Sequence, residues 1–267
     1  MVNASNPSAV LGIDIGGTGS KGAPVDVATG RLLAGRHVLA TPQPATPAAV
    51  AETLRQMVAH FGWAGPVGCT LPAIVHDGVT LSAANVDPSW VGAPAQRLLA
   101  EAVGLPLVLF NDADAAGSAE ARFGAAHGRG GKVLVITLGT GIGSALIVDG
   151  RLVANTELGH LRHPGTESAE KSCSARVKTD QNLGWDEYIA RLNGYLQYVE
   201  LLLSPDLIII GGGISRDHAD FLPRLQLRCQ VLPAQLQNDA GIVGAAIEAA
   251  QALVNPADVG CEHRSAR

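Results

Sequence analysis

The sequence predicts an α/β fold built from two similar domains with a cleft between them. Short apolar segments typical of buried strands alternate with longer segments of helical apolar spacing. An internal repeat divides the chain, because residues 10–34 begin VLGIDIGGTG and end GRLLA, while residues 133–154 begin VLVITLGTG and end GRLVA. Each copy reads as strand, glycine loop, strand, turn and strand. Coincidence between two glycine-rich turns is the alternative, but the flanking strands and the trailing GRL also match.

The first half of the chain reads as strands separated by helices. Apolar runs between glycine, proline and polar residues predict strands at 10–15, 25–26, 31–33, 67–71 and 105–110. Helical spacing predicts helices at 47–61, 93–103 and 113–123, with a linker at 42–47 before the first of them. Residues 1–9 are polar, and we expect them to be frayed.

The second half continues the alternation. The second repeat copy supplies strands within 133–154, an apolar strand follows at 207–210, and helices are predicted at 185–203 and 241–253. We therefore expect a small N-terminal domain at 1–111, a larger C-terminal domain at 112–240 and a tail at 254–267. We leave open whether the final helix at 241–253 packs back on the first domain.

The bulk properties restrict the class of protein. The chain has 267 residues, 47% hydrophobic and 16% charged, so it can bury a core and does not have the composition of a disordered chain. A net charge of −5 argues against a general nucleic-acid-binding protein, although it leaves room for a local basic groove. The chain shows no membrane-spanning stretch, no signal peptide and no CxxC pair among its four cysteines, so we expect a soluble protein of the reducing cytoplasm.

The first glycine loop formally matches a dinucleotide-binding pattern. Residues 17–22 read GTGSKG, which fits GxGxxG after a strand. That pattern needs a helix whose N-terminus receives the pyrophosphate, whereas a strand and a turn follow here. We therefore reject a dinucleotide fold, and a Walker loop is missing too, because no GxxxxGK[ST] segment occurs.

Glycine loops that join two strands are instead suited to phosphate. Their backbone N–H groups can converge on phosphate oxygens without obstruction by Cβ atoms. The expected phosphate-binding residues come from the first loop, the second loop and a third glycine segment at 211–213: Gly16, Gly17, Thr18, Gly19, Lys21, Thr140, Gly141 and Gly212. Asp14, at the end of the first strand, is placed to hold Mg²⁺ through water. The alternative is that Gly16 and Gly17 only form a hairpin.

Six motifs in order along the chain resemble the ROK family of sugar kinases and repressors, within the actin/hexokinase superfold. They are GIDIGGTGSKG at 12–22, NVDPSW at 85–90, FNDADAAG at 110–117, TLGTGIGS at 137–144, ELGH at 157–160 and IIIGGGIS at 208–215. Together they cover residues 10–250. The resemblance implies two ribonuclease H-like domains with an interdomain cleft.

Two departures from the commonest glucokinase pattern point to one branch of that family. The first loop reads GGTGSK rather than GGTK. The family's cysteine-rich zinc motif is missing, since 161–184 contains only Cys173, and we expect no structural zinc. Both departures, and the segment 182–215, resemble the polyphosphate glucokinase branch, which includes polyphosphate/ATP-glucomannokinases. The resemblance implies a hexokinase that transfers a phosphoryl group from inorganic polyphosphate, ATP or both to the 6-hydroxyl of glucose, with mannose left open.

Asp112 is the expected general base. It lies where a predicted strand ends and a helix begins, which is a usual place for a site carboxylate in α/β folds. Its family counterpart takes the proton of the 6-hydroxyl, a role that contributes about 10²–10⁴-fold in such reactions. The alternative is that Asp112 only caps the helix from Ala113, although Asp114 could fill that role.

Polar side chains that pair with sugar hydroxyls complete the expected site. The family places the following residues on the hexose: Asn85, Asn111, Asp112, Glu157, His160 and Glu170. The match of Glu170 is less secure, because Glu167 lies three residues away. Without the family, Asn85 could be a turn residue and His160 a core residue. Closure of the two domains is expected to exclude water, which competes as phosphoryl acceptor.

A polyphosphate chain would need a local basic track. The candidates lie near the glycine loops in sequence: Lys21, Arg129, Lys132, Arg176, Lys178 and Arg216. The alternative is that they are solvated surface charges.

Two other functions stay open. One is a ROK kinase that uses ATP only, for another hexose such as fructose or an N-acetylated sugar. The other is a sugar-sensing regulator, which we disfavour because only nine residues precede Val10, too few for a DNA-binding helix-turn-helix. We expect small-molecule partners, a hexose and a phosphoryl donor, with neither nucleic acid nor membrane, and leave a homodimer open.

Overall fold

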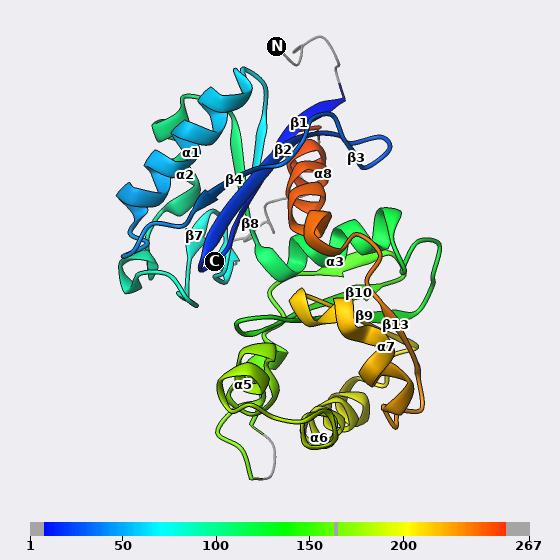
Figure 1. Cartoon of the computed structure of the whole chain (residues 1–267). Helices are drawn as coiled ribbons and strands as arrows, with labels where there is room; N and C mark the ends of the chain where they lie inside the picture. The colour runs from blue at the N-terminus through cyan, green and yellow to red at the C-terminus, as the bar shows by residue number, and fades with distance from the viewer. Residues whose placement is uncertain (1–7, 163–164, 255–267) are drawn as a thin grey trace, which may run out of the picture. The chain divides into compact units, whose positions relative to one another are not determined.

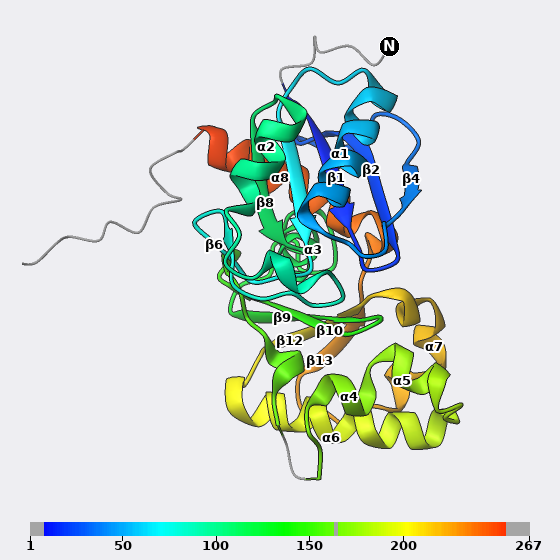
Figure 2. The same cartoon turned by 90° about the vertical axis from the view of Figure 1, so that its left-hand side faces the viewer.

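The computed structural model describes residues 8–162 and 165–254, and its elements fall into two units (Figures 1 and 2). The first unit comprises the chain up to Asp112 together with the part from Gly241 onward, and the second is Ala113–Ala240. In the described ranges no helix has the length and apolar character needed to cross a membrane.

The first unit is built on a mixed sheet with the strand order β3-β2-β1-β5-β8, and β4 pairs with β2. β1 is antiparallel to β2 and parallel to β5, which is parallel to β8. The strands are β1 (Ala9–Ile15), β2 (Gly19–Asp26), β3 (Arg31–Leu32), β4 (His37–Ala40), β5 (Val67–Leu71) and β8 (Leu107–Asn111). The unit also contains the small hairpin β6 (Val75–His76) and β7 (Val79–Thr80), and the 3₁₀ turn η1 (Pro88–Trp90).

Helices α1 (Pro47–Phe61) and α2 (Ala95–Val103) cover one face of this sheet (Figure 1). The alternation along β1 sends Leu11, Ile13 and Ile15 into the core under these helices. Local chemistry sets both ends of α1: the Thr46 side chain accepts a hydrogen bond from the N-terminal turn, and Gly62 ends the helix in the left-handed conformation at φ 54°. α1 thus has the limits that the sequence predicts.

The last helix of the described residues, α8 (Ala240–Val254), covers the other face of the same sheet (Figure 1). It approaches at two glycines, where a Cβ on Gly12 would lie 2.9 Å from the carbonyl carbon of Ile242 and one on Gly68 would overlap the carbonyl oxygen of Ala245. Helix backbone therefore rests directly on strand backbone. Asp14 lies on the same face, beside the helix start at Gly241.

The second unit has a five-stranded sheet with the order β11-β10-β9-β12-β13. β9, β10 and β11 are antiparallel neighbours, and β12 and β13 run parallel to β9. The strands are β9 (Lys132–Leu138), β10 (Ile142–Val148), β11 (Arg151–Val153), β12 (Leu207–Gly211) and β13 (Gln230–Pro233). Strand order and directions are those of β3-β2-β1-β5-β8 in the first unit.

Alternate residues of these strands serve two cores. Leu134, Ile136 and Leu138 of β9 pack with α6 (Trp185–Leu203), whereas Val133 and Val135 pack on the side of α3 (Asp112–Phe123). Short helices join α6 on its face: α4 (Ala169–Cys173), α5 (Ala175–Asp180) and α7 (His218–Phe221). The remaining 3₁₀ turns are η2 (Leu158–His160), η3 (Gly213–Asp217), η4 (Leu222–Arg224) and η5 (Gln237–Asp239).

The α/β class is confirmed, and most predicted elements are present with small shifts. α2 begins at Ala95 rather than at 93, because Pro94 stands at its cap, and β8 runs from 107 to 111. β2 is longer than predicted, since its first residues include two glycines that lower the strand signal. The prediction that the tail starts at 254 was wrong by one residue, because Val254 ends α8. The rest of the predicted tail, and residues 1–7, lie outside the described residues.

Candidate active site

The first glycine loop is a turn between β1 and β2, and side chains of the segment at 41–43 donate hydrogen bonds to its carbonyl groups. Gly16 N donates to Gly19 O at 3.0 Å. The Thr41 hydroxyl donates to Gly16 O at 2.6 Å, and the Gln43 amide donates to Gly17 O at 3.0 Å. Thr18 is exposed at the tip. Thr41 and Gln43 therefore fix the loop by hydrogen bonds to the carbonyl groups of the loop.

A carboxylate with two fixed partners lies beside this loop. The Asp14 Oδ1 atom accepts a hydrogen bond of 2.7 Å from the hydroxyl of Thr70, and Oδ2 lies 3.1 Å from the ammonium of Lys21. Asp14 is 14% exposed and Thr70 is fully buried. One partly exposed carboxylate is a donor set that suits Mg²⁺, which usually takes one or two protein carboxylates and completes its shell with phosphate and water. The residues present therefore fit this ion.

Asn85 packs against Gly17 of the first loop. It has a left-handed backbone, with φ 59°, and a Cβ added to Gly17 would lie 2.9 Å from the Cβ of Asn85. An expected sugar residue and an expected phosphate residue of the first unit are therefore in contact. This close approach also explains why position 17 is a glycine.

Asn111 and Asp112 lie at the carboxyl end of β8. Asn111 is buried and its side-chain amide donates to Ala73 O at 3.1 Å. Asp112 is the first residue of α3. Asp114 does not fill the capping role with its Oδ2 atom, which accepts a 2.7 Å hydrogen bond from Asn155 N. Asp112 thus has the position expected of a site carboxylate in an α/β fold.

The second glycine loop joins β9 and β10 and is fixed by α5. Gly139 N donates to Gly141 O at 3.0 Å. Arg176 donates from its backbone N to Gly139 O at 3.1 Å and from Nε to Thr140 O at 3.2 Å. The third glycine segment is adjacent, since a Cβ on Gly212 (φ 81°) would overlap the carbonyl oxygen of Leu138 and lie 2.6 Å from its backbone nitrogen. Two expected phosphate segments of the second unit therefore lie together.

Three expected sugar residues gather in the second unit. The ring of His160 lies 3.7 Å from the Glu157 carboxylate, and Glu170 Oε2 accepts a 3.0 Å hydrogen bond from Ile142 N at the second loop. Burial raises the pKa of Glu157, an effect that His160 opposes and the negative charge of Glu170 reinforces. The cluster therefore joins two carboxylates and one imidazole.

The partly buried carboxylate of Glu157 should lower the stability of the fold at neutral pH. Its folded-state pKa lies above the unfolded value, so the folded protein gains stability as pH falls through that raised pKa and loses it as Glu157 ionises. We expect Glu157→Gln to raise the Tm at pH 7.5 by up to about 3 °C, with a smaller gain near pH 4. Thermal unfolding at both pH values checks this. Glu187→Gln, on the surface of α6, serves as control and should show no such gain; a lower Tm for Glu157→Gln at pH 7.5 contradicts the prediction.

The basic residues that were expected to form a polyphosphate track make different kinds of contact in the structure. Lys132 is occupied elsewhere, because its ammonium donates to Leu203 O at the end of α6 at 2.6 Å. Lys178 lies over the ring of Trp185, 4.3 Å from its centre. Arg176 adjoins the second loop, and Lys21 adjoins Asp14. Cys173, the lone cysteine of 161–184, is a core thiol whose pKa burial raises to about 12.

Sequence reasoning missed two residues that position site groups. Thr70 stands opposite Asp14 in the parallel pair of β1 and β5, and only that pairing brings the two together. Ser144 accepts a hydrogen bond from Leu158 N at 3.0 Å and so holds the turn that follows Glu157. The alternation of β10 could have placed Ser144 inward, but not its partner.

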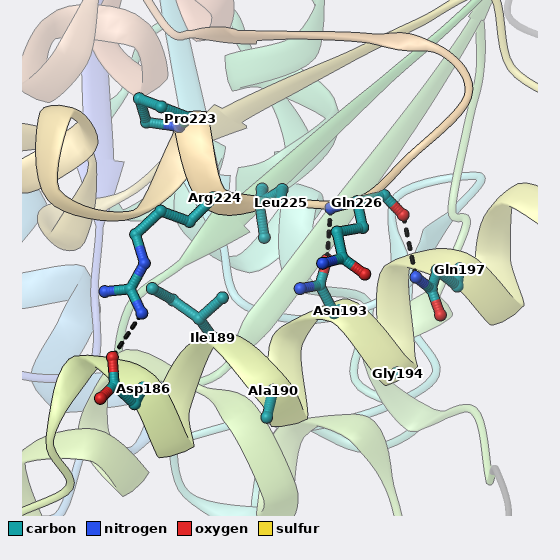
Figure 3. Close-up of a pocket in the computed structure, with 10 residues that line it drawn as sticks. All are labelled: Asp186, Ile189, Ala190, Asn193, Gly194, Gln197, Pro223, Arg224, Leu225 and Gln226. Carbon is teal, nitrogen blue, oxygen red and sulfur yellow. Dashed lines mark hydrogen bonds and ion pairs between the residues drawn. The ribbon is translucent and has the colours of Figure 1, made fainter.

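A groove of about 680 Å³ lies between α6 and the segment 223–226 (Figure 3). Its polar groups already pair with one another, as Arg224 does with Asp186, and as Asn193 and Gln197 do with the backbone of Gln226. None of the expected site residues lines it: the lining is Asp186, Ile189, Ala190, Asn193, Gly194, Gln197, Pro223, Arg224, Leu225 and Gln226. The groove is therefore a junction within the second unit and not the candidate site.

Comparison with known proteins agrees with these features. The model of the ROK family matches residues 10–177. Polyphosphate glucokinase of Mycobacterium tuberculosis is 48% identical over 238 residues, which are 89% of this chain and 89% of that protein. The structure of inorganic polyphosphate/ATP-glucomannokinase from Arthrobacter sp. strain KM matches with a TM-score of 0.88 and 52% identity, over 91% of this chain and 99% of that one. A ROK family glucokinase from Streptomyces griseus, in complex with glucose and AMPPNP, matches with a TM-score of 0.79 and 27% identity, over 91% and 99%.

Proposed function

Because the chain belongs to the ROK family, we propose that it is a hexokinase that phosphorylates the 6-hydroxyl of glucose with inorganic polyphosphate, ATP or both. The likeness to polyphosphate glucokinases and to the glucomannokinase extends over about nine-tenths of the chain. The observation that carries the proposal furthest is that each unit joins a glycine loop to an expected sugar residue. Gly17 meets Asn85, and the loop at Ile142 meets Glu170.

The proposed hexose-binding side chains are all polar. In the first unit these are Asn85, Asn111 and Asp112, and in the second they are Glu157, His160 and Glu170. Amides and a neutral imidazole can both donate to and accept from sugar hydroxyls, whereas ionised carboxylates accept from them. A site of this kind rejects analogues that lack a hydroxyl, because its buried polar groups are then left unpaired.

In the reaction the 6-hydroxyl oxygen attacks the terminal phosphorus of the donor while Asp112 accepts the hydroxyl proton. The bond to the leaving phosphate breaks, which releases ADP or a polyphosphate shortened by one unit, and Asp112 later returns its proton to solvent. Backbone N–H groups of the glycine loops hold the phosphate oxygens, with help from Thr18 and Lys21. Asp14 would hold Mg²⁺, which neutralises phosphate charge when bound.

The two units are proposed to be copies of one ribonuclease H-like domain. Support comes from the shared order and direction of their strands, and from the glycine loop that joins the first two strands in each. In this proposal α8 belongs to the first domain, with residues 1–111, and residues 112–240 form the second.

A matrix of sugars against donors tests the function. Purified protein with Mg²⁺ is incubated with glucose, mannose or fructose and with ATP or polyphosphate, and the sugar phosphate is measured. We expect glucose to react with at least one donor and fructose to react at least tenfold more slowly. No turnover of glucose with either donor contradicts the proposal. Turnover only of another hexose with ATP would indicate the alternative kinase, and binding without turnover would indicate a regulator.

A further inference from the structure

Glu170 contacts the second glycine loop as well as the sugar cluster. Its Oε2 atom accepts a 3.0 Å hydrogen bond from the backbone N–H of Ile142. A Cβ added to Gly141 would lie 2.8 Å from the carboxyl carbon of Glu170. The carboxylate therefore occupies the space that the glycine leaves open, and it fills part of the backbone hydrogen-bonding capacity of the loop.

The sugar cluster adjoins the same loop, since Gly159, which lies between Glu157 and His160 in the chain, packs on the carbonyl oxygen of Ile142. The negative charge of Glu170 acts on Glu157, which itself lies beside His160. A carboxylate has two oxygens and about four acceptor positions, so one hydrogen bond to the loop leaves capacity for sugar hydroxyls. A single rigid group can then bond both partners at once.

We propose that Glu170 couples hexose binding to donor binding by holding the glycine loop at 139–143 in its phosphate-binding conformation. This rests on the proposed function, because it takes Glu170 to bind the sugar and the loop to bind the donor. A hexose that fixes the carboxylate also fixes the loop, so part of the ordering cost of the loop is met before the donor arrives. By linkage, donor and hexose then strengthen each other's binding by the same factor. Toward the donor, Glu170 is a positioning residue.

The test measures the Kd of the donor analogue AMPPNP, and of tripolyphosphate, by calorimetry. Both are measured without hexose, and AMPPNP is measured again with saturating glucose. In the unsubstituted protein, glucose should lower the Kd of AMPPNP by about fivefold or more. In Glu170→Ala, the Kd of both phosphate ligands without hexose should rise about five- to tenfold, and glucose should no longer change that of AMPPNP.

Three further variants separate coupling from simple sugar binding. Glu157→Gln should weaken glucose binding, and its effect on AMPPNP binding without hexose should be smaller than that of Glu170→Ala, because Glu170 bonds the loop directly. Glu167→Gln should change neither, since Glu167 is 70% exposed and pairs with Lys171. Gly141→Ala displaces the Glu170 carboxylate but keeps it in the chain, so it should weaken AMPPNP binding as Glu170→Ala does. The double variant should be no worse than Glu170→Ala alone.

The results separate this proposal from the proposed function. If Glu170→Ala binds AMPPNP and tripolyphosphate as tightly as the unsubstituted protein, the coupling is wrong even when glucose is phosphorylated normally. If the unsubstituted protein binds neither ligand, the coupling is wrong as well. Thermal unfolding is recorded for each variant, and if Glu170→Ala does not fold, Glu170→Gln and Gly141→Ala decide. Absence of glucose turnover, with the loss of phosphate binding in Glu170→Ala still present, contradicts the function and leaves the role of Glu170 at the loop supported.

Discussion

Asp112→Asn should lower kcat by roughly 10²–10⁴-fold and leave glucose binding nearly intact. The asparagine has almost the same shape and can still hydrogen-bond a hydroxyl, but it cannot accept the proton in the transition state. Because α3 begins at Asp112, a polar first residue is retained and the helix should stay formed. Steady-state kinetics gives the change in kcat, and calorimetry with glucose gives the binding.

A matched substitution shows whether the charge as such matters. Asp220→Asn, on the exposed side of α7, removes one negative charge from a segment that contains no candidate residue. Its kcat and glucose affinity should equal those of the unsubstituted protein. A kcat for Asp112→Asn within threefold of the original would remove Asp112 as the general base.

Gly68→Ala should destabilise the fold by about 3 kcal/mol and lower the Tm by about 6–12 °C. The added methyl group would overlap the carbonyl oxygen of Ala245, which is backbone and cannot rotate away as a side chain can. α8 must then separate from the sheet, and buried residues such as Ile242 and Ile247 lose packing. Asp14 lies on the same face against the start of α8, so the Mg²⁺ dependence of activity should change too. Thermal unfolding and a Mg²⁺ titration measure both effects.

Gly194→Ala is the control for this experiment. Gly194 lies within α6, and a Cβ there meets no atom within 4 Å. Alanine lowers the backbone entropy of the unfolded chain, so the free energy of unfolding of this variant should rise by about 0.5–1 kcal/mol. If Gly68→Ala unfolds at the temperature of the original protein, α8 does not press on the sheet as the structure indicates.

The parts of the fold that local chemistry determines were predicted best. Thr46, Pro47 and Gly62 together define α1, and the apolar runs of β5 and β12 are strands as expected. The short edge strand β4 was missed because its residues are only partly buried, and β13 because its burial depends on its neighbour β12.

In the candidate site, too, contacts between residues close in sequence could be predicted, whereas contacts that depend on tertiary packing could not. Glu157 and His160 lie three residues apart and meet within one turn, so their proximity could be read from the chain. The contact of Thr70 with Asp14 joins residues 56 positions apart and depends on the pairing of β1 with β5. Likewise, only the docking of α4 on the second loop brings Glu170 to Ile142. The roles of the site residues in catalysis stay predictions.

The docking of α8 has a consequence for the co-translational folding of the protein on the ribosome. Nascent chains fold from the N-terminus as they are made, yet α8, which is made after the whole second unit, fills a face of the unit made first. Until residues 240–254 leave the ribosome, the glycine-bearing face of that sheet lacks its cover. Nascent chains should therefore remain inactive until α8 has left the ribosome. A chain that ends before Ala240 would leave this face of the first unit's sheet uncovered.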